Sequence, residues 1–138
     1  MHAYFVNLSA VLLGSAIGGV ARFWASALVG RWLGPRFPWG TLVVNISGSM
    51  LVGVLVSGMR TLETVVSLSS AEELLIVGVC GSYTTVSSFA LQTFDLTRES
   101  RWRAACINVV TSFALCLLGI WLGWWLGSTL AFWMMGSA

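Results

Sequence analysis

The sequence predicts an all-α membrane protein with four transmembrane helices, and two observations carry that prediction. Of the 138 residues, 57% are hydrophobic and only 9% are charged, whereas a soluble domain carries roughly a quarter charged residues. The few charges divide the chain into apolar runs, each about as long as the roughly 20 residues that a helix needs to cross a bilayer. We therefore expect one four-helix domain over residues 1–138, with helices at about 4–30, 40–59, 73–95 and 102–135.

The segments between these runs have compositions typical of turns at the membrane surface. Residues 30–40 contain two prolines, three glycines and two tryptophans, and residues 95–103 are short and charged, which is typical of a hairpin loop between helices. Before the third run, Ser70 and Glu73 have the spacing of a capping box. The N-terminal residues lack a basic region and a cleavage pattern, so we expect no signal peptide.

The basic residues are all arginines, and their distribution predicts an orientation. Four spans put the loops at 30–40 and 95–103 on one side of the membrane, which then holds Arg31, Arg36, Arg98, Arg101 and Arg103. The other side holds only Arg60, so the positive-inside rule favours both termini outside the cytoplasm. The net charge of +2 is too small and dispersed to predict a nucleic-acid partner. We expect a multi-pass protein of the cell inner membrane, surrounded by lipid.

The positions of the acidic residues exclude several kinds of chemistry. Every acid lies in an expected loop or at a helix end: Glu63, Glu72, Glu73, Asp95 and Glu99. This removes the proton relays and cation sites typical of pumps, and it leaves no credible acid–base pair, so we expect no enzyme. A small multidrug or cation exporter remains an alternative of similar size, but it needs a carboxylate inside the membrane. The three cysteines lie in apolar runs without metal-site spacing, which is typical of buried structural thiols.

A few polar residues do fall inside the spans. Arg22 is the one embedded charge, and it either snorkels to the interface or stands at the mouth of an anion path. Thr41, Asn45 and Ser49 recur every four residues and so share one face of the second helix. Asn108, Ser112 and Cys116 do the same on the fourth helix. Such groups either bond between helices or face an ion, and the amide of Asn45 offers two donors that an anion requires.

The third run is the most polar at membrane depth. Gly78 and Gly81 precede five Ser and Thr hydroxyls within residues 81–89, GSYTTVSSF. Glycine weakens a helix there, and non-helical backbone at this depth survives only when it is buried in protein or lines a wet cavity. We expect the third helix to break near its middle, where chains meet around an ion or a pore. The alternative is a continuous helix whose hydroxyls bond back to their own carbonyls.

Glycines at four-residue spacing mark close helix contacts. Gly14 and Gly18 lie in the first span, and Gly119, Gly123 and Gly127 lie in the last. This spacing lets helix backbones approach closely in lipid. Because four short helices enclose little interior, we interpret these glycines as favouring a homo-oligomer.

Three motifs, met in order along the chain, resemble those of the Fluc (CrcB) family of fluoride channels. Residues 18–23 (GGVARF) resemble a Gly-rich segment with arginine in the first helix. Residues 40–48 (GTLVVNISG) resemble G-T-x-x-x-N-x-x-G, and residues 78–89 (GVCGSYTTVSSF) resemble G-x-x-G-G-x-T-T-F-S-T-F. The resemblance implies an antiparallel, dual-topology dimer with two pores that exports fluoride passively. It also implies a structural sodium ion at the dimer centre, held by the backbone carbonyls of Gly81 and Thr84.

The same resemblance implies which residues meet the ion. Arg22 matches a vestibule arginine, and the pore positions are Thr41, Asn45, Thr85, Val86, Phe89 and Ser112. An aromatic ring has a positive edge, so Phe89 can meet a small anion without trapping it, and conduction needs sites that the ion can leave.

The chain departs from the family pattern at four positions. Val86 occupies the position of the family's first phenylalanine, and Ser82 that of the second glycine of a pair. Gln92 occupies a position where many members have glutamate, and Asn108 one where many have tyrosine. These departures bear on conduction and selectivity rather than on the fold. The arginine bias is a further tension, because a dual-topology homodimer should show little bias. Some family members pair two oppositely biased chains, so one subunit of a heterodimeric channel is the alternative.

Overall fold

A computed structural model describes residues 2–62 and 69–136 of the chain. All regular secondary structure in these ranges is helical. Four stretches are long and apolar enough to cross a membrane, namely Tyr4–Leu33, Trp39–Arg60, Ser70–Arg98 and Trp102–Met134. The predicted class, an all-α protein with four membrane spans, is therefore confirmed.

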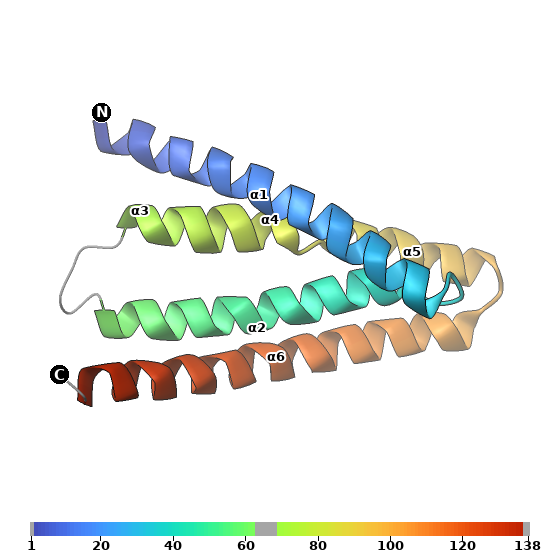
Figure 1. The fold of residues 1–138 in the computed structure, drawn as a ribbon. Helices are drawn as coiled ribbons and strands as arrows, with labels where there is room; N and C mark the ends of the chain where they lie inside the picture. The colour runs from blue at the N-terminus through green and yellow to red at the C-terminus, as the bar shows by residue number, and fades with distance from the viewer. Residues whose placement is uncertain (1, 63–68, 137–138) are drawn as a thin grey trace.

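Three of the spans are single helices, of which two, the second and the last along the chain, lie side by side and run in the same direction, whereas the first runs the opposite way (Figure 1). They are α1 (His2–Leu33), α2 (Trp39–Leu62) and α6 (Trp102–Gly136). Both chain ends lie at the same end of the molecule (Figure 1). The turn between α1 and α2 uses Gly34 at φ 81°, a left-handed conformation that glycine adopts without steric cost.

The third span is assembled from four short helical pieces rather than one helix. They are α3 (Ser69–Glu72), the π-helix η1 (Glu73–Cys80), α4 (Gly81–Tyr83) and α5 (Val86–Arg98). Thr84 and Thr85 separate α4 from α5 with extended backbone, at ψ 158° and ψ 117°. The interruption lies where the hydroxyl cluster predicts a break. The wide π-helical winding before it has no counterpart in the sequence analysis.

Glycines let the spans pack closely within the chain. A Cβ atom at Gly14 of α1 would lie 2.9 Å from the Cα of Gly78 in η1, and one at Gly123 of α6 would lie 2.9 Å from the carbonyl carbon of Met50 in α2. Real side chains do not tolerate such distances, so these glycines are required by contacts inside one chain. The oligomer contact that we expected from their spacing must be sought elsewhere on the molecule.

One polar contact differs from its sequence prediction. The capping box at Ser70 and Glu73 is wrong, because Ser70 lies inside α3 and Glu73 begins η1. The Ser70 hydroxyl instead donates to Oδ1 of Asn7 in α1 at 3.0 Å. This hydrogen bond ties the start of the third span to the first helix.

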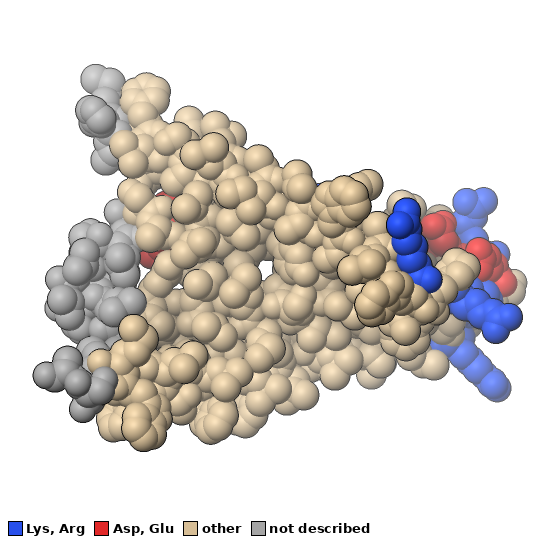
Figure 2. Space-filling view, in the orientation of Figure 1, with Lys and Arg blue, Asp and Glu red and all other residues tan. Residues whose placement is uncertain are grey.

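The basic side chains visible in Figure 2 gather at one end of the molecule, where α1 turns into α2 and α5 turns into α6, and some acidic atoms show at the opposite end. Arg101 donates to the backbone oxygen of Arg36 and pairs with Glu99 at 3.3 Å, so it joins the two turns. Arg60 lies in the last turn of α2 at the opposite end, with its guanidinium 5.5 Å from the ring centroid of Trp124. The uneven arginine distribution of the sequence is therefore also an uneven distribution between the two ends of the fold.

We predict that Gly123→Ala destabilises the protein by about 1–3 kcal/mol, the usual cost of overpacking, because its Cβ would press on the Met50 carbonyl. Gly58→Ala is the matched control, since a Cβ there meets nothing within 4 Å. Thermal unfolding of both variants in detergent, followed by helical circular dichroism, measures the difference. Equal midpoints would show that α2 and α6 do not approach this closely.

Candidate functional site

At the interruption of the third span, the side chain of Asn45 from α2 bonds the backbone of Thr85. Thr85 is extended, so its N–H and C=O point to the same side, as in a strand. The N–H donates to Oδ1 of Asn45 at 2.8 Å, and Nδ2 of Asn45 donates to the Thr85 carbonyl at 3.0 Å. This pair of bonds has the pattern of a hydrogen-bonded antiparallel pair in a sheet. The Asn45 amide therefore replaces the helical partners that Thr85 lacks.

Hydroxyls complete the start of α5. Thr85 is its N-cap, and its Oγ1 accepts from the backbone N–H of Ser88 at 3.2 Å. The same oxygen lies 3.1 Å from the hydroxyls of Ser87 and Ser88. An N-cap of this kind satisfies one of the N–H groups that a helix start leaves without a partner. The hydroxyls of the third span therefore stabilise the backbone at the break, rather than only bonding back along a continuous helix.

These two diversions free particular carbonyls on the other side of the break. In a continuous α-helix the N–H of Thr85 would bond the oxygen of Gly81, and the N–H of Ser88 would bond the oxygen of Thr84. Both N–H groups bond side chains instead. Within residues 69–98 no backbone hydrogen bond runs from α5 back to the oxygens of residues 81–84. Gly81 is exposed on the single chain and Thr84 is half-buried, so this polar edge lies near the molecular surface.

The surface of the chain beside the break, which carries Ser47 of α2 and Tyr83 of α4 and which we call the outer face, is also polar. The hydroxyls of Ser47 and Tyr83 lie 3.0 Å apart, and Ser47 is exposed. A Cβ at Gly48 of α2 would collide with the Thr84 methyl and lie 3.2 Å from the Tyr83 ring. Gly48 thus lets the broken span approach α2 closely enough for Asn45 to reach it.

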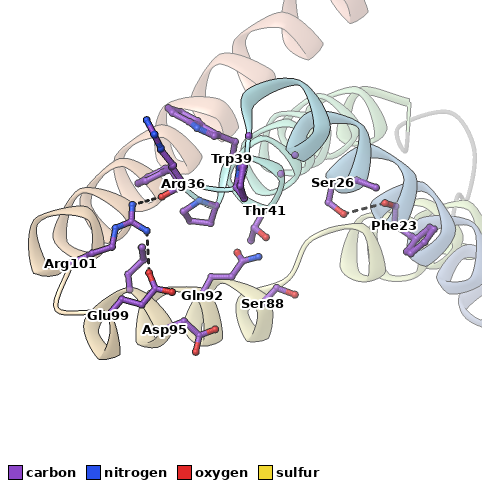
Figure 3. Close-up of a pocket in the computed structure, with 18 residues that line it drawn as sticks. Phe23, Ser26, Arg36, Trp39, Thr41, Ser88, Gln92, Asp95, Glu99 and Arg101 are labelled. Carbon is purple, nitrogen blue, oxygen red and sulfur yellow. Dashed lines mark hydrogen bonds and ion pairs between the residues drawn. The ribbon is translucent and has the colours of Figure 1, made fainter.

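A cavity of about 490 Å³ opens at the charged end of the molecule. Its wall includes Arg36, Arg101, Asp95 and Glu99 near the turns, and deeper in it Thr41 of α2 and Ser88 and Gln92 of α5 lie on facing sides (Figure 3). The Oε1 atom of Gln92 is buried and, among the described residues, has no hydrogen-bond partner. The cavity is therefore lined by charged groups near the turns and by neutral polar groups farther from them.

Two smaller cavities follow on either side of the Asn45–Thr85 pair. The first, of about 170 Å³, shares part of its wall with the large cavity and is lined by Arg22, Phe23, Ser26, Thr41, Val44, Thr85 and Ser88. The second, of about 300 Å³, is lined by Asn45, Val86, Phe89, Val109, Ser112, Phe113 and Cys116. We call the second one the α6 cavity. The first of these cavities adjoins the large one, whereas the α6 cavity shares no lining residue with either and meets the first only at the hydrogen-bonded Asn45–Thr85 pair.

The structure divides the residues predicted for the fluoride path between these cavities. Arg22, Thr41 and Thr85 line the one of about 170 Å³. Asn45, Val86, Phe89 and Ser112 line the α6 cavity. Gly81 and Thr84, predicted as carbonyl donors, line none of the three cavities and lie at the break beside the outer face.

The donors in the α6 cavity are fewer than the sequence suggested. One N–H of the Asn45 amide is used by the Thr85 carbonyl, which leaves one of the two donors that the residue type offers. Ser112 is only 8% exposed, and its hydroxyl has no hydrogen-bond partner among the described residues. The cavity thus presents one amide N–H, one hydroxyl and the ring of Phe89.

The structure also adds residues that the sequence analysis did not place in the path. Phe113 and Cys116 line the α6 cavity, and Ser88 and Gln92 line the large one. Ser88 and Gln92 lie one helical turn apart, which is a spacing signal, but it becomes informative only once the start of α5 is known. The expectation that all three cysteines are buried holds for Cys80 alone, since Cys106 is exposed and Cys116 is half-buried.

Asn108 has a different role from Ser112, although four residues separate them. It is 2% exposed, and its Nδ2 donates to Oγ1 of Thr93 in α5 at 2.8 Å. Thr93 in turn donates to the Phe89 carbonyl at 2.7 Å. Residues spaced by four drift by about 40° around a helix, so Asn108 faces α5 whereas Cys116 has rotated into the α6 cavity. The predicted polar stripe is therefore split between helix packing and cavity lining.

Comparison with known proteins gives a consistent set of relatives. The family described as CrcB-like protein, Camphor Resistance (CrcB), matches residues 9–124. The chain is 45% identical over 113 residues to a protein named Fluoride-specific ion channel FluC from Paramagnetospirillum magneticum, which covers 82% of this chain and 88% of the relative. A relative of the same name from Coxiella burnetii is 41% identical over 126 residues, or 91% of this chain and 100% of the relative. All residues that line the two smaller cavities fall inside the matched range.

We predict that Thr93→Val lowers stability by about 1–3 kcal/mol, because it leaves the buried Asn108 amide without a partner. Adding Asn108→Leu to Thr93→Val should recover most of this loss, since replacing both partners by apolar groups removes the unpaired amide. Unfolding midpoints of both single variants and the double variant, measured in detergent, form the cycle. Purely additive losses in the double variant would mean that the two side chains do not interact.

Proposed function

Because the chain belongs to the CrcB-like family, we propose that it is a fluoride-selective ion channel that exports cytoplasmic fluoride passively. Relatives that it matches over most of their length are named fluoride-specific ion channels. The structural observation that carries the proposal is the meeting of Asn45, Phe89 and Ser112 in one cavity. Family membership places the chain among channels rather than enzymes, and it also removes the multidrug exporter as an alternative.

The cavity series suits a small, strongly hydrated anion. Arg22 and the arginines at the charged end of the fold supply positive potential at the entrance. Farther along, fluoride would exchange its water for the Asn45 N–H, the Ser112 hydroxyl and the ring edge of Phe89. None of these groups carries a full charge, so each can bind the ion and release it, as conduction requires. Val86 is 79% exposed beside them and offers no ring edge, which concentrates recognition on the other three groups.

The functional unit that we propose is an antiparallel, dual-topology dimer with two pores. Gly81, Ser47 and Ser87 are exposed at membrane depth on the single chain, and lipid offers such polar surface no partner. A second copy packed against the break would cover it. The freed oxygens of Gly81 and Thr84 fit a hard cation such as sodium, which prefers oxygen ligands. Bound between two copies, sodium would offset the partial negative charges of these carbonyl oxygens.

A second candidate differs in the partner. Five arginines at one end of the fold and Arg60 at the other favour one orientation in the membrane, whereas two antiparallel copies require both. The chain would then be one subunit of a heterodimeric channel, paired with a similar chain of the opposite bias. In either form the protein crosses the membrane several times, and we propose the cell inner membrane as its location.

We predict that liposomes containing the purified chain release fluoride, and that Asn45→Asp abolishes this release. The carboxylate would repel the anion, and it would also set an oxygen against the Thr85 carbonyl that Nδ2 now bonds. Asn7→Asp is the matched control, because Asn7 accepts from Ser70 through Oδ1, a contact that a carboxylate keeps. A fluoride electrode measures the release of both variants beside the wild type.

The same assay separates the candidates. Undiminished release from Asn45→Asp liposomes would remove Asn45 from the pathway. The folded wild-type chain could release no fluoride by itself, yet release it when co-purified with a similar chain of the opposite arginine bias. That result would establish the heterodimer and reject the homodimer. Silence in both preparations would reject the fluoride channel.

We predict that removing sodium weakens the dimer. Protein prepared in N-methylglucamine salts should lose dimer on size exclusion in detergent, because the carbonyls of Gly81 and Thr84 would face each other across the seam without a cation. Added sodium should restore the dimer, whereas the larger potassium ion should restore less. An unchanged dimer fraction in sodium-free buffer, with sodium absent by elemental analysis, would reject the sodium site.

A further inference from the structure

Cys116 of α6 occupies an unusual position for a membrane thiol. It follows Ser112 by one helical turn and lines the α6 cavity together with Asn45 and Phe89. It is half-buried, and its thiol is free. Because the cavity lies on the proposed fluoride path, any group attached to this sulfur would stand beside the donors that the ion uses.

The cavity has a second feature that points to a ligand. The Ser112 hydroxyl is in a residue that is 8% exposed, and it lines the cavity without a hydrogen-bond partner in the described part of the chain. One N–H of the Asn45 amide also remains after its bond to Thr85. A donor that no protein group satisfies is free to bond an acceptor that enters the cavity. The site therefore suits a ligand that brings a halide or another acceptor atom next to the sulfur.

We propose that Cys116 is a modification site for small, neutral, thiophilic metal halides, and that its modification blocks the fluoride path. Mercuric chloride represents the class, because it is uncharged and suits a wall made mainly of Val86, Phe89, Val109 and Phe113. In the reaction the S–H and one Hg–Cl bond break and an S–Hg bond forms, while the proton and one chloride leave. The chloride that stays on mercury can accept from Ser112 and Asn45. The block rests on the proposed channel function, whereas the modification does not.

The other two cysteines provide internal controls. Cys106 is exposed on α6 and lines a separate cavity of about 290 Å³ with Trp102 and Val110. Cys80 is 1% exposed and lies at the end of η1. Neither residue lines any of the three cavities of the proposed path. Reaction at Cys106 would therefore leave that path open.

The test treats channel liposomes with mercuric chloride and compares each protein with its own untreated release. We expect wild type and Cys106→Ser to fall to the release of protein-free liposomes, and dithiothreitol to restore both. Cys116→Ser should keep its untreated release. Equal loss in Cys116→Ser and wild type, or resistance of wild type, would overturn the block.

A second readout does not depend on conduction. Peptide mass mapping of the treated, folded protein should find mercury on Cys116, and Ser112→Val should slow this labelling by removing the donor beside the sulfur. Labelling confined to Cys106 would overturn the modification site. If wild type conducts no fluoride at all, the proposed function fails, while the mapping still decides whether Cys116 is the reactive thiol.

Discussion

The two hydrogen bonds between the Asn45 amide and the backbone N–H and C=O of Thr85 are the interaction on which the rest of the site depends. In the hydrocarbon layer a backbone N–H or C=O that leaves a helix finds no water and needs another partner. Asn45 provides both a donor and an acceptor for one extended residue. A side chain with only one of these functions would leave either the N–H or the C=O of Thr85 without a partner.

The geometry of the break follows from that pair. With Thr85 held extended, α5 begins at Val86 and places Phe89 in the α6 cavity on one side and Ser88 in the polar cavities on the other. The same extended residue withholds its N–H from the Gly81 oxygen. Thus one amide opens a hollow beside α6 and exposes carbonyls toward the outer face. The proposed fluoride path and the proposed sodium site are consequences of one local departure from helical bonding.

Much of this arrangement could be predicted from the sequence, because a helix that crosses a membrane must be apolar over its whole length. Uncharged runs of sufficient length predicted the four spans. The five hydroxyl residues that follow Gly78 and Gly81 in the sequence predicted where the third span would break. The contacts could not be predicted in the same way. Glycine spacing indicates a close approach but not its partner, so the partners of Gly14 and Gly123 within the same chain were unexpected. The π-helical winding of η1 was also missed, since apolar runs have no distinct pattern for a wider helix.

The site itself was predictable as a set of residue types, but not as a set of free donors. Counting from the residue type gives Asn45 two donors, whereas the fold uses one of them for the backbone. Asn108 looked equivalent to Ser112 by spacing, yet it holds α5 to α6 through Thr93. Such differences depend on which residue of another helix contacts the side chain, and the local sequence does not show that residue.

The small number of donors has a functional consequence for a conducting site. Each added donor deepens the well in which a hydrated anion exchanges its water, and an ion held too firmly cannot move on. Here the Asn45 amide keeps one N–H after its bond to Thr85, Ser112 offers one hydroxyl, and Val86 contributes only aliphatic surface. On the proposed path, fluoride would therefore meet a series of weak contacts, with the positive charge of Arg22 in a separate cavity. If the α6 cavity is part of the path as proposed, the need to satisfy the broken backbone would limit how tightly it binds the ion, and that limit would favour passage over retention.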